Sequence, residues 1–95
     1  MKPTDYNTTY STIIDDGASL QQFYLLTNQL SRNKKVRFTG KLDEADTIDW
    51  NFKYRGYPLT LHYNIYNGVT LSQQSGKDLK VVNEVAIILK GKSYQ

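Results

Sequence analysis

The stretch Trp50–Gln73, WNFKYRGYPLTLHYNIYNGVTLSQ, decides the fold, because apolar and polar residues alternate along most of its length. Successive side chains of a β-strand point to opposite faces, so this alternation predicts a sheet with one apolar face and one polar face. Breaks at Gly56 and at Asn67-Gly68 divide the stretch into successive strands. The pattern therefore predicts antiparallel hairpins in a half-buried sheet.

The same alternation extends upstream of Trp50, so four strands are expected in all. They are expected at residues 35–41, 47–53 and 59–66 and from Val69 onward. The turn around Glu44 joins the first two strands. For the apolar faces of these strands to coincide, Phe38 is matched with Trp50.

The register of the next hairpin follows from the rule that a one-residue slip sends apolar side chains into water. A two- or four-residue loop centred on residues 56–57 pairs Phe52 with Leu61 and Trp50 with Tyr63. A three-residue loop would set Trp50 opposite a polar residue. We therefore predict the even-numbered loop.

The last hairpin contains Asn67-Gly68, which is typical of a two-residue type I′ turn. That turn would place Val69 and Leu71 on the polar face. A three-residue loop that ends at Gly68, with this glycine in the left-handed region, pairs Ile65 with Val69 instead. It also keeps both aliphatic residues inside, so we predict the three-residue loop and its bulge.

A first helix is predicted over residues 20–31. Ser19 and Gln22 have the spacing of a capping box, in which each side chain binds a free backbone amide at the helix start. One helical face carries Leu20, Phe23, Leu26, Thr27 and Leu30.

Residues 79–90 can be interpreted in two ways. Their β-branched residues favour a fifth strand. Helical spacing is instead kept by Leu79, Val82, Ala86 and Leu89. Ser75 and Asp78 resemble a capping box upstream, and Gly91 stands where a helix C-cap would be. We favour the helix.

These elements predict one α+β domain over residues 1–95, a two-layer sandwich of helix, four-stranded antiparallel meander and helix. Both helices are expected to cover the apolar face of the sheet. Residues 1–16 are expected to be partly ordered, and whether residues 6–14 form an edge strand is left open. Residues 92–95 are expected to be a mobile tail.

Composition excludes several classes of function. The chain has no cysteine and one histidine, so neither a disulfide framework nor a cysteine or histidine-rich metal site is expected. The beginning of the sequence lacks the apolar core of a signal peptide, and no apolar run approaches a membrane span. A cytoplasmic location and no membrane partner are the expectation.

His62 is the residue best suited to acid–base chemistry near neutral pH. The predicted register sets it opposite Asn51, with Asp49 one pair away. Candidate nucleophiles such as Thr60 and Ser72 lie on a flat face, where no oxyanion pocket is implied. No phosphate-binding glycine motif occurs. We therefore expect a non-enzymatic protein with no catalytic residue, bound metal or cofactor.

The polar face of the sheet is the expected binding surface. Its candidate contact residues are Arg37, Asn51, Lys53, Arg55, His62 and Tyr66. The predicted function is a protein–protein interaction module with an unidentified partner, or with itself as a homodimer paired through an edge strand. The alternative is a weak basic nucleic-acid-binding protein, because the net charge is +3 and aromatic residues are abundant.

Overall fold

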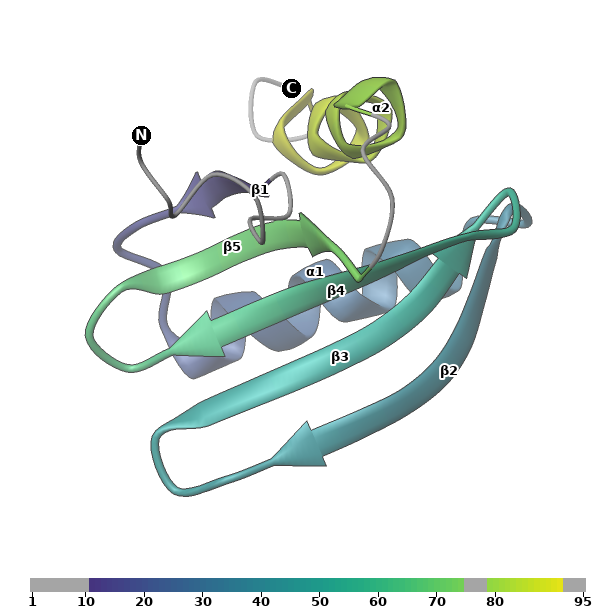
Figure 1. Ribbon diagram of the computed structural model, residues 1–95. Coiled ribbons are helices and arrows are strands. Elements are labelled where there is room, and N and C mark those ends of the chain that lie inside the picture. The colour runs from purple at the N-terminus through teal and green to yellow at the C-terminus, as the bar shows by residue number, and fades with distance from the viewer. Residues whose placement is uncertain (1–10, 75–78, 92–95) are drawn as a thin grey trace, which may run out of the picture.

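The computed structural model describes residues 11–74 and 79–91, which form one five-stranded antiparallel sheet and two helices (Figure 1). The order of the strands across the sheet is β1-β5-β4-β3-β2. The elements along the chain are β1 Ser11–Asp15, α1 Leu20–Ser31, β2 Val36–Asp43, β3 Thr47–Tyr54, β4 Tyr57–Asn64, β5 Gly68–Gln73 and α2 Leu79–Gly91.

The sheet therefore has one strand more than the four predicted, which form the successive strands β2 to β5. The additional strand is β1, which lies at the edge of the sheet and pairs with β5. The sequence alone does not decide whether residues 6–14 form an edge strand, and β1 overlaps the end of that segment. Residues 6–10 lie outside the described residues. Because β1 and β2 occupy opposite edges, α1 connects the two edges and runs across the sheet (Figure 1).

The predicted start of α1 is confirmed. The Oγ of Ser19 accepts a hydrogen bond from the backbone N–H of Gln22 at 3.2 Å. Of the predicted apolar face, Phe23, Thr27 and Leu30 are buried and Leu26 is partly buried. Leu20, the first residue of the helix, is instead 44% exposed. Local capping and a single apolar stripe thus specify this helix together.

The helical interpretation of residues 79–90 is also confirmed, since α2 spans Leu79–Gly91. Val82, Ala86 and Leu89 are buried at helical spacing. Val85 is fully buried as well. The predicted capping pair of Ser75 and Asp78 lies outside the described residues.

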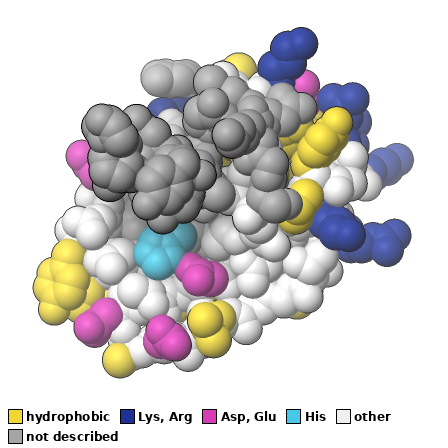
Figure 2. All heavy atoms as spheres, viewed as in Figure 1, with side chains coloured by type: hydrophobic (Ala, Val, Ile, Leu, Met, Phe, Trp, Pro, Cys, Tyr) yellow, Lys and Arg dark blue, Asp and Glu magenta, His cyan; other side chains and the backbone are white. Residues whose placement is uncertain are grey.

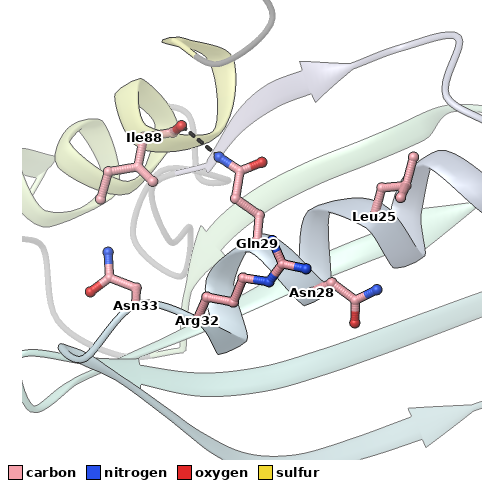
Figure 3. A pocket seen from close by; sticks show the side chains of 6 residues that line it. All are labelled: Leu25, Asn28, Gln29, Arg32, Asn33 and Ile88. Carbon is pink, nitrogen blue, oxygen red and sulfur yellow. Dashed lines mark hydrogen bonds between the residues drawn. The ribbon is translucent and has the colours of Figure 1, made fainter.

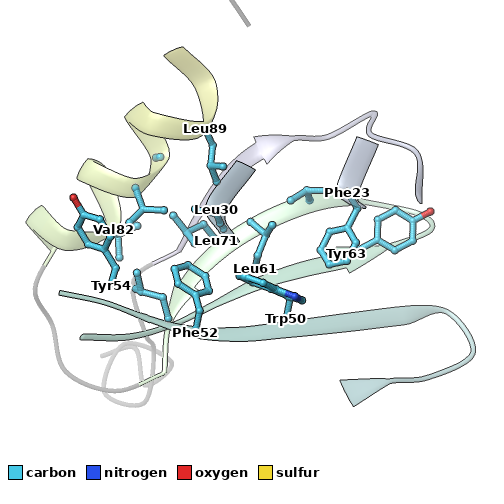
Figure 4. Packing of buried hydrophobic residues seen from close by; sticks show 14 of the residues in the cluster. Phe23, Leu30, Trp50, Phe52, Tyr54, Leu61, Tyr63, Leu71, Val82 and Leu89 are labelled. Carbon is cyan, nitrogen blue, oxygen red and sulfur yellow. The ribbon is translucent and has the colours of Figure 1, made fainter. Parts of the chain in front are cut away.

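Buried side chains of α1, of α2 and of the sheet belong to a single core (Figure 4). The sheet contributes Trp50 and Phe52 from β3, Leu61 from β4 and Leu71 from β5, as the alternation predicts. The rings of Trp50 and Phe52 also contact each other, with their centroids 5.4 Å apart. We call this buried side the inner face and the opposite side the outer face.

The predicted register between β3 and β4 is wrong by two residues. Trp50 pairs with Leu61 and Phe52 with Leu59, because the turn is formed by Arg55 and Gly56 rather than being centred on residues 56–57. Both turn residues have positive φ, 54° and 89° respectively, as a type I′ hairpin requires.

The register between β4 and β5 is likewise shifted by two residues. Tyr63 pairs with Val69 and Asn64 with Gly68, so Ile65 belongs to the loop and is 51% exposed rather than paired with Val69. The left-handed conformation predicted for Gly68 is confirmed by its φ of 81°. The three-residue length of the loop is correct, but the loop begins one residue earlier.

The predicted match of Phe38 with Trp50 is wrong by two residues, and β2 also contains a bulge. Phe38 pairs with Phe52, and the register then shifts so that Gly40 pairs with Asn51 and Lys41 with Trp50. Although the two are not paired, the Phe38 and Trp50 rings still approach to 5.3 Å between centroids. Beyond the bulge, the face that each β2 residue occupies is reversed relative to the simple alternation.

Candidate binding face

The outer face consists of cross-strand rows of polar side chains. One row runs from β3 to β1 through Asn51, Thr60, Ser72 and Ser11. The next row contains Asp49, His62, Thr70 and Ile13, with Leu42 of β2 next to Asp49. Directly paired residues on one face of a sheet have adjacent side chains, so these rows define which groups can act together.

A shallow polar hollow lies at the centre of this face. It is lined by Ser11, Asp49, Thr60, His62, Thr70 and Ser72. The Nδ1 of His62 forms a short hydrogen bond with the Oδ1 of Asp49, and both side chains are about one-third exposed. His62 therefore pairs with Asp49, and the predicted position opposite Asn51 is wrong because of the two-residue shift.

The chemistry of this hollow is limited by the arrangement of its hydroxyl groups. The Thr60 hydroxyl donates to the Oδ1 of Asn51 at 2.6 Å, so it is already engaged by a neighbouring strand. Among the described residues, no hydroxyl forms a hydrogen bond with the His62 ring. Searching that same part of the chain finds no group of three or more potential metal ligands. An oriented imidazole is present, without a nucleophile aligned to it.

A second hollow, which we call the basic hollow, lies at the end of the sheet where β2 begins and β3 ends. Its charged lining residues are Lys34, Lys35, Arg37, Lys53 and Arg55. Arg37 and Lys53 are directly paired across β2 and β3. The backbone N–H of Arg55 donates to the carbonyl of Lys35 at 2.9 Å, which ties the β3–β4 turn to the segment before β2. In Figure 2, many Lys and Arg side chains gather toward one side of the molecule.

The cations of the basic hollow differ in their partners. Arg55 forms an ion pair with Glu84 of α2, with an Nη1–Oε1 distance of 3.2 Å. Within the described part of the chain, no ion pair is formed by Lys34, Lys35, Arg37 or Lys53. Four cations of this hollow thus form no ion pair with a carboxylate of residues 11–74 or 79–91.

Tyr66 lies at the opposite end of the sheet, in the β4–β5 loop, and is 76% exposed. The loop is held by hydrogen bonds from the Tyr66 N–H to the Oδ1 of Asn64, at 2.7 Å, and from the Ile65 N–H to the carbonyl of Asp46, at 3.1 Å. The eight residues of β4 separate this loop from the β3–β4 turn by roughly 25 Å, at about 3.3 Å per residue.

The six predicted site residues therefore do not form one cluster. Arg37, Lys53 and Arg55 meet at the basic hollow, Asn51 and His62 lie in the middle of the face, and Tyr66 stands at the far end. Each of the six lies either on the outer face or at one end of the sheet.

Other residues at this face did not appear among the predicted contacts. Lys34 and Lys35 precede β2 and complete the basic hollow; their position beside Arg37 in the sequence is a signal that was available. Leu42 lies on the outer face only because of the β2 bulge, which the alternation does not reveal. Ile13 is 56% exposed and lies on the outer face as part of β1, a strand whose presence the sequence alone does not decide.

A further hollow lies on the helical side of the molecule, where α1 and α2 approach each other (Figure 3). It is lined by Leu25, Asn28, Gln29, Arg32, Asn33 and Ile88. The Nε2 of Gln29 donates to the backbone carbonyl of Ile88 at 2.9 Å and so bridges the two helices. This hollow is explained by helix packing.

Comparison of the chain with protein-family models, curated protein sequences and solved structures finds no match. Neither helix that the structure describes is long and apolar enough to cross a membrane.

Proposed function

We propose that the chain is a non-enzymatic, cytoplasmic protein-binding module whose contact surface is the outer face of the sheet. We place both helices on the inner face, since Phe23 of α1 and Val82 of α2 belong to the same core as Leu61. The outer face is then the side of the sheet from which a partner approaches.

The observation that carries the proposal is the distribution of exposed apolar side chains around a polar centre. Ile13 and Leu42 are 56% and 53% exposed at the two edges of the row that contains His62. Tyr66 is 76% exposed at one end of the same face. Tyr combines a large apolar area with a polar tip and is enriched in protein interfaces.

The proposal is tested by placing a photo-crosslinking amino acid at position 66 and illuminating the protein in an extract of its native host. A covalent adduct with a discrete protein is expected. The matched control carries the same amino acid at position 87, because Ile87 is 68% exposed but lies on α2. Equal adducts from both positions, or none from position 66, would overturn the proposed contact surface.

A second candidate function, nucleic-acid binding, is favoured by one observation, the basic hollow. Its four cations without a carboxylate in contact can neutralise phosphates, and phosphate contacts dominate nucleic-acid affinity. The outer face offers little aromatic surface on which bases could stack, because Trp50 and Phe52 are buried in the core. Weak, sequence-independent binding through phosphate contacts is the form that this candidate takes.

Fluorescence anisotropy with a labelled single-stranded oligonucleotide tests the second candidate. Binding is expected at low salt, falling as salt rises and lost in the Arg37→Glu, Lys53→Glu double variant. The control is Lys80→Glu, Lys90→Glu, which changes the net charge equally but on α2. Equal losses in the two variants would indicate a general charge effect and count against the basic hollow.

A further inference from the structure

Charged side chains of the described chain are concentrated at the two opposite ends of the sheet. One end holds the basic hollow. We call the other the acidic end; its carboxylates are those of Asp15, Asp16, Asp43, Glu44 and Asp46. In Figure 2, carboxylates gather mainly on the side away from the largest group of Lys and Arg.

The acidic end is built from three separate connections that backbone contacts hold together. The Ile65 N–H donates to the carbonyl of Asp46, which joins the β4–β5 loop to the β2–β3 turn. The backbone of Asp15 and Asp16 lies directly against Gly68, which joins the β1–α1 turn to the same loop. The turns that carry these carboxylates therefore lie at the same end of the sheet, although they come from distant parts of the sequence.

Each end retains most of its charge. Arg55 is paired with Glu84 at the basic hollow, and Asp43 with Lys41 at 3.6 Å at the acidic end. Among the described residues, the remaining four cations and four carboxylates of these two sets form no ion pair. Among the described residues, four positive charges at the basic hollow and four negative charges at the acidic end thus remain outside ion pairs.

These two surfaces are too far apart to neutralise each other within one molecule. Strands β2 and β3 are eight residues long, so the ends are separated by roughly 25 Å at about 3.3 Å per residue. The Debye length at physiological ionic strength is about 8 Å, about one-third of that separation. Only another molecule can bring the opposite charges into contact.

We propose that the acidic end of one copy of this chain docks against the basic hollow of a second copy, so that copies associate head to tail. The proposal rests on the proposed protein-binding function and names a second copy as a partner. Shape agrees with charge, because Ile65 and Tyr66 are exposed at the acidic end while the cations line a hollow. The Tyr66 ring can then stack on the guanidinium of Arg37.

Head-to-tail contact differs from the pairing of two edge strands in a way that can be measured. An edge-paired dimer uses the same surface twice and stops at two copies, whereas unlike ends leave one end of each kind free for the next copy. Contacts between exposed charges are weak and screened by salt. Association is therefore expected to grow with concentration and to disappear at high salt.

The test uses two variants, each neutralised at one end, in sedimentation equilibrium at low salt. Arg37→Gln, Lys53→Gln disables the basic hollow, and Glu44→Gln, Asp46→Asn disables the acidic end; all four side chains are exposed, so folding is expected to be retained. The unmodified chain is expected to exceed the mass of a dimer as concentration rises. Each variant alone is expected to stay monomeric, and an equimolar mixture to form dimers and nothing larger.

Three results would overturn the proposal. These are a monomeric unmodified chain at high micromolar concentration and low salt, a variant that still dimerises alone, or a mixture that grows beyond dimers. The proposed function has its own readout, because a crosslink from position 66 to a different protein would support protein binding even where self-association fails. A crosslink to a second copy would support both.

Discussion

Gly68 is the residue on which the β4–β5 loop depends most directly. Its φ is 81°, and an added Cβ would overlap the backbone of Asp15 and Asp16. Gly68→Ala therefore combines a left-handed alanine with a collision against backbone that has no rotamer to relax. We expect a loss of more than about 2 kcal/mol in the free energy of unfolding, measured by urea denaturation.

Gly40→Ala is the matched control for that substitution. Gly40 lies beside the β2 bulge, and a Cβ there would meet nothing within 4 Å. Its unfolding free energy is expected to change by about 0.5 kcal/mol or less. If Gly68→Ala unfolded at the same urea concentration as Gly40→Ala, the close approach of β1 and the β4–β5 loop would be wrong.

Gln73 presents the opposite case, a side chain whose replacement is expected to stabilise the fold. It is 3% exposed, and its Oε1 has no hydrogen-bond partner among the described residues. Gln73→Met removes this buried acceptor while keeping the length of the side chain. We expect the free energy of unfolding to rise by about 1 kcal/mol.

The neighbouring glutamine provides a control of opposite sign. The Nε2 of Gln74 donates to the carbonyl of Leu59 at 2.8 Å, so Gln74→Met is expected to lower the free energy of unfolding by up to about 1 kcal/mol. Equal destabilisation by both substitutions would show that Oε1 of Gln73 is satisfied in solution.

At the scale of elements, α1 depends on its cap. Ser19→Ala removes the acceptor for the Gln22 N–H and is expected to cost about 1 kcal/mol, with faster amide exchange in the first helical turn. Ser31→Ala makes the same chemical change at the exposed last residue of α1, where it is expected to be nearly neutral. Comparable losses from the two variants would show that the loss at Ser19 does not come from capping, because alanine has a higher helix propensity than serine.

The strands show which part of the fold a sequence pattern can predict. Alternation assigned Trp50, Phe52, Leu61 and Leu71 to the inner face correctly, because burial has a period of two along a strand. A register error of two residues preserves that assignment, so the pattern has no power to detect it. Both hairpin registers failed by this amount.

The causes of those errors are local backbone conformations. Arg55 adopts a φ of 54°, which is rare for a residue with a Cβ, so placing the turn at Gly56-Tyr57 was reasonable and wrong. The β2 bulge follows from pairing with β3 and has no marker beyond Gly40, whose flexibility is compatible with a bulge. Such choices are decided by the whole sheet.

At the scale of the whole molecule, the candidate site was predictable in composition but not in layout. The run from Arg32 to Arg37 indicated a basic segment, and α1 brings that segment to the end of the sheet where β3 ends. Lys53 and Arg55 join it there through strand pairing and the β3–β4 turn. The separation of Tyr66 from Arg55 follows from the strand predicted over residues 59–66. The pairing of His62 with Asp49 required the structure, because the register determines which residues are neighbours.

Stability of the whole molecule is expected to fall at alkaline pH through Tyr54. Burial of its phenol raises the pKa of Tyr54 above the usual value of 10.0, and the hydrogen bond and negative charge of Glu84 raise it further. The unfolded chain therefore loses this proton at lower pH than the folded chain does. The stabilisation that the protonated Tyr54 phenol contributes is complete below about pH 10 and is lost as pH rises through the pKa of Tyr54 in the folded chain.

Urea denaturation at a series of pH values above 9, with tyrosinate absorbance recorded alongside, measures this decline. Tyr54→Phe has no proton to lose, so its free energy of unfolding is expected to fall less steeply with pH than that of the unmodified chain.

The pKa of Lys41 is also raised, mainly by its hydrogen bond with Tyr24. Loss of the Lys41 proton therefore also lowers the free energy of unfolding as pH rises. Lys41 is present in every variant, so the difference in slope isolates Tyr54. Tyr57→Phe is the control for removal of a tyrosine hydroxyl, since Tyr57 pairs with Tyr54 but is 43% exposed. An unchanged slope in Tyr54→Phe would show that the phenol ionises in the folded chain as readily as in the unfolded one, and the contact between β3 and α2 would then be looser than the structure has it.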